Sequence, residues 1–290
     1  MHVRENLKPL IPRFLHPVLR PLKGPVSKSA ISALPPTKFP LDPKVRDAIG
    51  ASLRKSMAAG IETPAPRSFP DVDELKSYWG IVRGITELLE PVNPDDKYFN
   101  WTHLQDHRRR GLLDISKDLF AIWVAVNQRP KLILEIGCRT GKSIATQLFI
   151  HPDRDACTCL LVDLFVEMGS PELIQRNLAH LRIPTSNVHA FVGYSESVFP
   201  QLMKELSDVR FDYVLVDGSH EREPALTDLN MVAPYVAKGG YVVFDDIGSY
   251  GPGVGYGLIE VWNVWKAEHQ QAFEFQEYPA PWGFAAARRR

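Results

Sequence analysis

Residues 131–143, with the sequence KLILEIGCRTGKS, constrain the fold of this chain more than any other stretch. The apolar run 132–134 is typical of a strand buried on both faces, and Gly137 and Gly141 follow the acidic Glu135. Glycine allows a tight turn and the close approach of a ligand, while the start of a helix presents free N–H groups to an anion. We therefore predict a strand, a tight turn and a helix start that together hold a small charged molecule.

The spacing of the glycines distinguishes between cofactors. A dinucleotide-binding turn has the pattern Gly-x-Gly-x-x-Gly, whereas this chain has Glu-x-Gly-x-x-x-Gly. This pattern resembles the first motif of class I S-adenosylmethionine (SAM) methyltransferases. The resemblance implies that Glu135 serves the positively charged methionine end of SAM and that the turn, with Gly137, Gly141 and Ser143, receives its carboxylate. A glycine-rich turn without a ligand is the alternative.

The composition excludes several classes of function. With 34 Lys+Arg and 34 Asp+Glu among 290 residues, the chain has no net charge that would recruit nucleic acid. Three cysteines are too few for a disulfide framework, and Cys157 and Cys159 lie in an apolar run, which predicts burial rather than metal binding. No secretory signal is evident and no window reaches about 18 apolar residues, the length that spans a bilayer. We expect a cytoplasmic protein.

Three regions are predicted along the chain. Residues 1–70 contain closely spaced prolines, which disfavour a long helix and predict an irregular arm with short helical turns. The start of this arm is basic with interleaved apolar side chains, which suits a membrane surface or a phosphorylated partner. Packing on a neighbouring subunit, or mobility, is the favoured alternative, and a homo-oligomer is expected. Residues 71–130 are expected to form a helical lid or substrate segment, and residues 131–290 the SAM-binding domain.

Aromatic and histidine side chains are concentrated in residues 97–110, ahead of the glycine turn. Ligands of a Rossmann-like fold sit at the carboxyl ends of the strands, so a segment that precedes the first strand can fold over that edge as a lid. The candidates to line a substrate pocket are Tyr98, Trp101 and His103. The alternative is aromatic packing on the flank of the sheet.

Periodicity predicts the remaining elements. Helices are expected at 71–89 (capped by Asp71), 111–128, 172–181, 197–207 and 257–269, and strands at 158–164, 188–192, 211–217, 241–246, 273–278 and 282–287. Regular alternation of strand and helix gives a parallel sheet covered by helices on both faces. The predicted fold class is α/β, a Rossmann-like, doubly wound, mostly parallel sheet. The methyltransferase resemblance implies seven strands, of which one in the terminal pair is antiparallel.

Two strand ends are candidates for binding adenosine. The sequence LLVDLF places Asp163 at the carboxyl end of the second strand, where an acid can accept both ribose hydroxyls. The stretch FVGYSES follows the third strand, and Ser195 and Glu196 occupy the position where the methyltransferases contact adenine. The alternatives are a strand-end aspartate without a ligand and a serine that caps a helix.

Acidic residues end the next two strands. Asp217 lies in the sequence DGSH, and Asp245 and Asp246 lie in the sequence FDD. Because the carboxyl ends of neighbouring parallel strands meet at one edge, we expect the three carboxylates to converge beside the cofactor. Their mutual repulsion is relieved by a hard divalent cation with oxygen ligands, and Mg²⁺ is the expected ion.

These motifs are similar to those of the metal-dependent O-methyltransferases of the catechol O-methyltransferase type, in the branch related to cephalosporin hydroxylase and macrocin O-methyltransferase. The similarity covers residues 95–290 and implies that Asp217, Asp245 and Asp246 bind the metal, with Asp217 also near the cofactor. His220 stands where catechol methyltransferases place a lysine that takes the substrate proton, which histidine can also do near neutral pH. A histidine that only orients Asp217 is the alternative.

The implied reaction is SAM- and Mg²⁺-dependent methylation of a hydroxyl on a small molecule, such as a sugar of a glycoside, a natural product or a vicinal diol. Methylation of an aromatic catechol is the close alternative. A metal-dependent hydroxylase or hydrolase is a rival, although an all-carboxylate rim argues against iron. A non-catalytic SAM-binding partner is a second rival, against which the cost of three converging acids without a metal argues.

Overall fold

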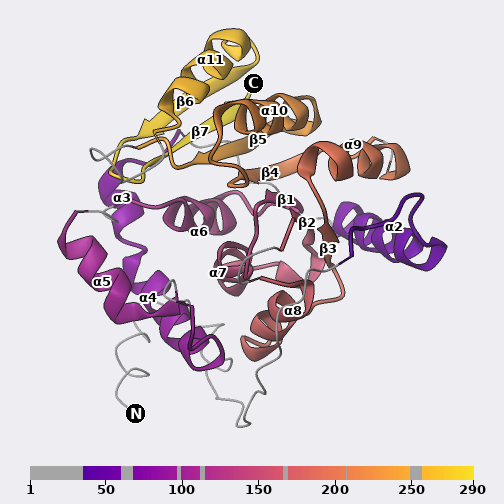
Figure 1. The fold of residues 1–290 in the computed structure, drawn as a ribbon, viewed down its shortest axis with the longest axis horizontal. Coiled ribbons are helices and arrows are strands. Elements are labelled where there is room, and N and C mark those ends of the chain that lie inside the picture. The colour runs from indigo at the N-terminus through magenta and orange to yellow at the C-terminus, as the bar shows by residue number, and fades with distance from the viewer. Residues whose placement is uncertain are drawn as a thin grey trace.

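The computed structural model describes residues 35–59, 68–96, 99–111, 115–165, 169–206, 208–248 and 257–290. Its centre is a seven-stranded sheet with the order β3-β2-β1-β4-β5-β7-β6 (Figure 1). The strands are β1 (Leu132–Ile136), β2 (Thr158–Asp163), β3 (Val188–Val192), β4 (Phe211–Val216), β5 (Val236–Asp245), β6 (Phe273–Tyr278) and β7 (Phe284–Arg289). Strands β1 to β5 pair in parallel, and β7 runs antiparallel to both β5 and β6. The predicted fold class, including its antiparallel terminal strand, is confirmed.

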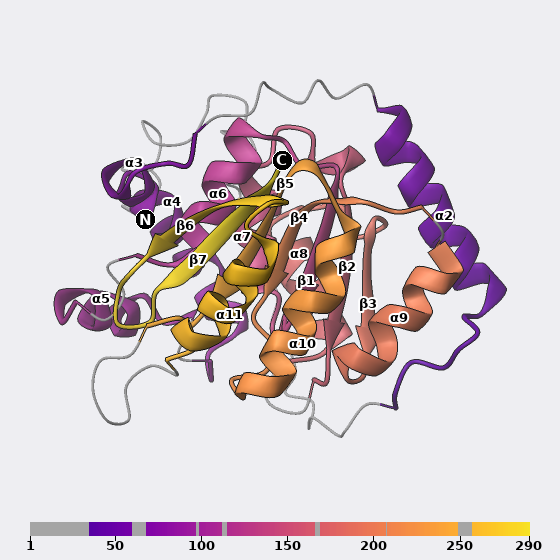
Figure 2. The ribbon, with the colours of Figure 1, turned by 90° about the horizontal axis from the view of Figure 1, so that it is seen from above.

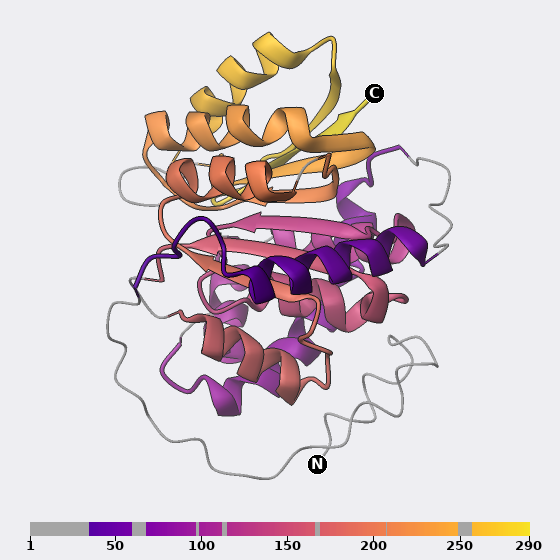
Figure 3. The same ribbon diagram turned by 90° about the vertical axis from the view of Figure 1, so that its right-hand side faces the viewer.

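Helices cover both faces of the sheet (Figures 1 and 3). One face carries α6 (Lys117–Asn127), α7 (Lys142–Ile150) and α8 (Pro171–His180), with α3 (Val72–Lys76), α4 (Trp79–Leu89) and α5 (Trp101–Arg109) beside them. The other face carries α2 (Pro43–Ala58), α9 (Ser195–Leu206), α10 (Arg222–Val232) and α11 (Ile259–His269). Short 3₁₀ turns lie at Glu90–Val92, Arg154–Ala156 and Ala233–Tyr235. The hydrophobic core is therefore split by the sheet into two layers.

The central strands are apolar on both faces because both faces are covered. All five residues of β1 are buried, and Cys157 before β2 and Cys159 within β2 are buried free thiols, as predicted. Helix α6 is also buried along most of its length, and Phe120 packs at ring distances of 5.5–5.9 Å from Trp123, Tyr241, Tyr278 and Phe284. Burial of one such phenylalanine stabilises the fold by about 1.5–3 kcal/mol. Helix α6 is thus fixed in the core rather than carried by a mobile lid.

The region before the glycine turn is more divided than its periodicity predicts. The helix predicted over residues 71–89 is broken into α3 and α4, because the Ser77 hydroxyl donates to the Glu74 carbonyl at 2.6 Å and competes with the helical backbone. The predicted cap is confirmed, since the Asp71 carboxylate accepts from the Glu74 amide at 2.8 Å. The helix predicted over residues 111–128 begins only at Lys117.

The prediction of an irregular arm over residues 1–70 is wrong for α2. Pro43 stands in the first turn of this helix, where proline is tolerated, and no proline follows until residue 64. The helix lies beside α9 and β2 (Figure 2) and bonds to β2 through the hydroxyls of Ser56 and Thr158 at 2.6 Å. Just before it, the Thr37 amide donates to the Val192 carbonyl at 2.8 Å and covers the edge of β3. Residues 1–34 and 60–67 of the arm lie outside the described residues.

Among the described residues, no helix combines the length and the apolar character that a membrane crossing requires.

Candidate functional site

A cavity of about 970 Å³ opens at the carboxyl ends of the parallel strands. It is walled by the turn after β1, by the segments that follow β2 to β5, and by side chains from α4, α5 and the start of α6. Predicted site residues that line it are Glu135, Gly137, Ser143, Asp163, Ser195, Glu196, Asp217, His220, Asp245 and Asp246. Predicted residues from Glu135 to Asp246 therefore meet in one cavity, as the strand pattern predicts.

The two glycines of the turn have different structural tasks. Gly137 has φ +83°, and a Cβ on it would lie 2.0 Å from the Asp217 carbonyl oxygen, so the turn touches the backbone that follows β4. Gly141 has φ +72° and starts α7, and a Cβ there would lie 2.9 Å from the side chain of Ile174 in α8. Both positions require glycine for conformation and for space. Gly141 shapes the turn without lining the cavity itself.

Glu135 and Ser143 flank this turn. The Glu135 carboxyl is 3% exposed at the end of β1, and burial, opposed by the positive charge of Lys117, raises its pKa to about 8. In the ligand-free protein this carboxyl is therefore largely neutral near neutral pH, and a cationic ligand beside it would favour its ionised form. The Ser143 hydroxyl donates to Asp118 at 2.7 Å, which ties the start of α7 to the start of α6.

Asp163 is held by backbone amides of two loops. Its Oδ2 accepts from the Arg139 amide at 2.7 Å, and its Oδ1 accepts from the Phe165 amide at 2.6 Å. Each carboxylate oxygen has a second lone pair. The carboxylate is thus oriented towards the cavity with acceptor capacity left for a ligand.

Ser195 begins α9 at the far side of the same cavity. Its hydroxyl donates to Oδ1 of Asp228 at 2.5 Å, and burial raises the pKa of Asp228 to about 6. The proton of Ser195 is therefore engaged inside the protein, while its oxygen remains able to accept. Glu196 follows it and also lines the cavity.

Lys117, the first residue of α6, is the functional side chain that the sequence did not reveal. Its Nζ contacts Oδ2 of Asp217 and Oδ2 of Asp245 and forms an ion pair with each. These partners lie 100 and 128 residues further along the chain, so nothing in the local sequence links Lys117 to them. In the sequence, Lys117 is one polar residue of a predicted amphipathic helix. A lysine within the chain therefore relieves part of the repulsion among the acids, in addition to the divalent cation that the sequence predicts there.

One ammonium does not neutralise three acids. Burial raises the pKa of Asp217 well above its usual range, with Lys117 opposing this shift and Asp245 and Asp246 adding to it. Burial likewise raises the pKa of Asp245 to about 6, again against the effect of Lys117. Burial and mutual repulsion thus disfavour the ionised forms of Asp217 and Asp245 at this rim, which Asp246 completes, and a further cation would favour them.

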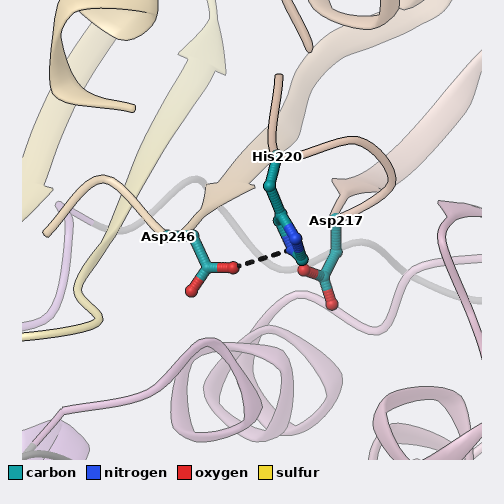
Figure 4. Close-up of side chains that lie close together, drawn as sticks. All are labelled: Asp217, His220 and Asp246. Carbon is teal, nitrogen blue, oxygen red and sulfur yellow. Dashed lines mark ion pairs between the residues drawn. The ribbon is translucent and has the colours of Figure 1, made fainter. Parts of the chain in front are cut away.

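The compact group of possible metal ligands differs from the predicted one. One donor atom each from Asp217, His220 and Asp246 lie within 4.8 Å of one another (Figure 4). His220 Nε2 is 3.1 Å from Oδ2 of Asp246, a residue whose φ of +58° turns its side chain out of line with β5. Asp245 instead faces Lys117. Two carboxylates and an imidazole at this spacing suit a divalent cation, so the donor set fits a metal.

The wall opposite the acids comes from α4 and α5. It presents Trp79 and Val82 from α4, and His103, Leu104 and His107 from α5. The rings of His103 and His107 lie 4.1 Å apart, one helical turn from each other. This places His103 in the cavity as predicted, next to a tryptophan that the sequence analysis did not select.

Trp101 does not take the role predicted for it. Its ring packs under the Arg83 guanidinium at 5.6 Å, and it lines a separate shallow depression with Asn100 and Arg109. Trp101 begins α5 and lines this depression, whereas His103 lines both the depression and the main cavity, and His107 lines the main cavity. Tyr98 lies outside the described residues.

Comparison with known proteins places the central part of the chain. Residues 134–247 match a family model described as a methyltransferase domain. An uncharacterized protein, R132, of Acanthamoeba polyphaga mimivirus is 31% identical over 119 residues, which cover 40% of this chain. The match spans about half of that relative, 52% of its length.

A solved structure shows the same fold. The SAH-bound methyltransferase PaMTH1 of Podospora anserina superposes with a TM-score of 0.51 at 14% identity, covering 87% of this chain and 98% of its own. The segment that matches the family model, residues 134–247, runs from within β1 to just past β5. It contains the glycine turn, Asp163 and the three acids Asp217, Asp245 and Asp246. The match of residues 134–247 to the methyltransferase-domain model bears out the resemblance to methyltransferases inferred from the sequence.

Proposed function

We propose that this protein is a SAM-dependent, divalent-cation-dependent O-methyltransferase that moves a methyl group to a hydroxyl of a small molecule. The observation that carries the proposal is a single cavity in which the glycine turn and Asp163 stand at one end and the acids of the rim at the other. A volume of about 970 Å³ is at the upper end for small-molecule sites, so it has room for a cofactor and an acceptor together.

The cofactor end is assigned by charge and by hydrogen-bonding capacity. The start of α7 offers backbone amides to the methionine carboxylate, because the amides of Gly137, Arg139 and Gly141 already donate within the protein. The buried Glu135 offers a carboxyl to the positively charged methionine end. Asp163, fixed by two amides, accepts from the ribose hydroxyls. Ser195 and Glu196 line the same cavity and would contact the adenine ring.

Asp217 and Asp246 would hold the cation, for which Mg²⁺ is the first candidate. When bound, the cation would supply positive charge beside the accepting oxygen and lower its affinity for a proton. His220 reaches the same point, and Asp246 orients its ring through the 3.1 Å contact. We assign His220 as the group that accepts the substrate proton.

The wall of α4 and α5 supports a proposal for the acceptor class. Trp79 is 6% exposed, lies under the Arg108 guanidinium at 5.1 Å and adds apolar surface to this wall, while His103 and His107 offer hydrogen bonds to hydroxyls. This combination suits a hydroxylated ring with two adjacent oxygens, as in the sugar of a glycoside or natural product. An aromatic catechol fits the same wall and is the second candidate.

Transfer of the methyl group from radiolabelled SAM tests the proposal. The acceptors would be methyl glycosides with vicinal hydroxyls and, in parallel, catechol, each with Mg²⁺ and with excess EDTA. We expect label in one acceptor class together with release of S-adenosylhomocysteine, and loss of both in EDTA. Transfer that persists in EDTA would remove the cation from the proposal, and failure of the protein to bind SAM in calorimetry would remove the whole proposal.

The role of His220 is tested separately. In His220→Asn, a proton acceptor is lost, so turnover should fall by about two orders of magnitude while the affinity for Mn²⁺ changes little. If His220 serves as a metal ligand instead, the affinity for Mn²⁺ falls with turnover. Titration of both proteins with Mn²⁺ and assay of both at saturating Mn²⁺ separate these roles.

A further inference from the structure

Lys117 contacts Asp217, one of the carboxylates that a cation at the rim would use. Its ammonium bridges Oδ2 of Asp217 and Oδ2 of Asp245, and both acids line the cavity. The lysine side chain is 20% exposed and those of the two acids are 18% and 13% exposed, so water screens these contacts only partly. Ion pairs in such a setting respond strongly to the arrangement of nearby charge.

The backbone of Lys117 is fixed on the side of the glycine turn. Its neighbour Asp118 accepts from Ser143 at 2.7 Å and pairs with Lys142 at 3.4 Å. Helix α6 behind it is buried against the sheet. Movement of the ammonium away from the acids therefore has to come from the lysine side chain, and the cavity that it lines gives that side chain room.

The rim thus has two sets of side-chain contacts. Lys117 serves Asp217 and Asp245, while His220 faces Asp246 at 3.1 Å. Asp217 belongs to both the lysine contact and the compact donor group with His220 and Asp246. A divalent cation that binds that group meets the lysine ammonium at Asp217, and two positive charges at one carboxylate repel each other.

We infer that Lys117 is an internal competitor for the divalent cation, so that cation binding at the rim requires the Lys117 ammonium to leave Asp217. The inference rests on the cation site of the proposed function and extends it to a residue that sets the affinity of the site. Without a cation, Lys117 keeps the acids together. With a cation, Asp217 and Asp245 are freed to face it.

The test compares Mn²⁺ affinities, measured from the electron paramagnetic resonance signal of free Mn²⁺, without SAM or acceptor. In Lys117→Met the competing charge is removed at similar side-chain length, and Mn²⁺ should bind at least about tenfold more tightly than in wild type. Lys117→Arg keeps the charge and should stay within about threefold of wild type. The matched control is Lys142→Met, which removes a neighbouring lysine that pairs with Asp118 rather than with the rim, and it should also stay within about threefold.

The inference is overturned if Lys117→Met binds Mn²⁺ no more tightly than wild type. It is also overturned if Lys142→Met gains as much Mn²⁺ affinity as Lys117→Met. If wild type shows no measurable Mn²⁺ binding and Lys117→Met does bind Mn²⁺, the inference is supported. In that case the Lys117 ammonium prevents binding in wild type. Absence of binding in both overturns the inference and the cation dependence together. SAM binding, measured on the same samples, reports separately on the methyltransferase assignment.

A measurement on wild type covers the case in which Lys117→Met does not fold. Lysines are acetylated briefly with acetic anhydride with and without Mg²⁺, and the modified fraction at each lysine is read by mass spectrometry. Displacement by Mg²⁺ should raise acetylation of Lys117 at least about threefold relative to Lys142, because an ammonium released from two carboxylates reacts more readily. An unchanged ratio overturns the inference.

Discussion

The two ends of the cavity hold their acids in different ways. At the cofactor end, Asp163 is oriented by backbone amides of Arg139 and Phe165, which lie in the turns after the two adjacent strands β1 and β2. At the rim, Asp217 and Asp245 are held by the side chain of Lys117, which comes from a helix before the first strand. Local backbone therefore builds the first end, and distant side-chain charge builds the second.

This difference predicts that the two ends fail independently. A substitution at the cofactor end should weaken SAM and spare the cation, while a substitution at the rim should do the reverse. The following predictions test that separation, beginning with the largest effect.

Asp245→Ala should reduce turnover by about 10²–10⁴-fold, because it removes a rim acid and leaves Lys117 with Asp217 alone. SAM affinity should change by less than about threefold, since Asp245 lies away from the glycine turn. Steady-state assays give the first value and calorimetry the second. A large loss of SAM affinity would show that the two ends are one coupled unit.

Gly137→Ala should lower the free energy of unfolding by about 3 kcal/mol, because its Cβ would overlap the Asp217 carbonyl at a positive φ. Gly239→Ala is the matched control. It also has a positive φ, at +79°, but nothing lies within 4 Å of its Cβ, so it should cost only about 1 kcal/mol. Urea unfolding measures both. Equal losses would mean that the close contact between the turn and the end of β4 contributes nothing.

Asp163→Asn should lower the affinity for SAM about tenfold. The two oxygens of Asp163 accept from the Arg139 and Phe165 amides, whereas asparagine has one oxygen and one NH₂ group and so loses an acceptor. Mn²⁺ affinity should stay unchanged. Calorimetric titrations with SAM and with Mn²⁺ make the comparison, and a loss in both would contradict the separation of the two ends.

Glu135 should make SAM binding release about one proton near neutral pH. Its pKa of about 8 leaves the carboxyl protonated in the free protein, and a positively charged methionine group beside it lowers that pKa, so the proton leaves on binding. SAM affinity should accordingly rise as the pH approaches 8 from below. Calorimetry in buffers of different ionisation enthalpy counts the protons, and Glu135→Gln should show no such release.

Much of the fold was predictable because it is encoded locally. Strand β3 was predicted with its observed bounds, since a short apolar run is enclosed by turn residues. The prediction for β5 began five residues late, at Tyr241 instead of Val236. The pair Gly239 and Gly240 reads as a turn, but it lies inside the strand, where Gly240 closely approaches the Phe211 carbonyl and the register against β4 shifts.

Site residues that the strand pattern positions could be predicted from the sequence, whereas those that act through distant side-chain contacts could not. Asp163 and Asp245 are the last residues of their strands, and Asp217 and Asp246 follow theirs directly, so the parallel sheet itself brings the four acids to one edge. Lys117 and Trp79 could not be identified in this way, because both stand on helices whose pattern reports burial and not the direction of one side chain. Helix α2 was missed for the opposite reason, since the high density of prolines in residues 1–70 concealed a proline-free stretch after Pro43.

The most direct test of the account is a crystal grown with S-adenosylhomocysteine and Mn²⁺, measured for anomalous scattering. We expect the ribose at Asp163, an anomalous peak between Asp217 and Asp246 at about 2.0–2.3 Å from their oxygens, and the Lys117 ammonium away from Asp217. S-adenosylhomocysteine outside this cavity, or a Lys117 still seated on both acids with no peak beside it, would contradict the account.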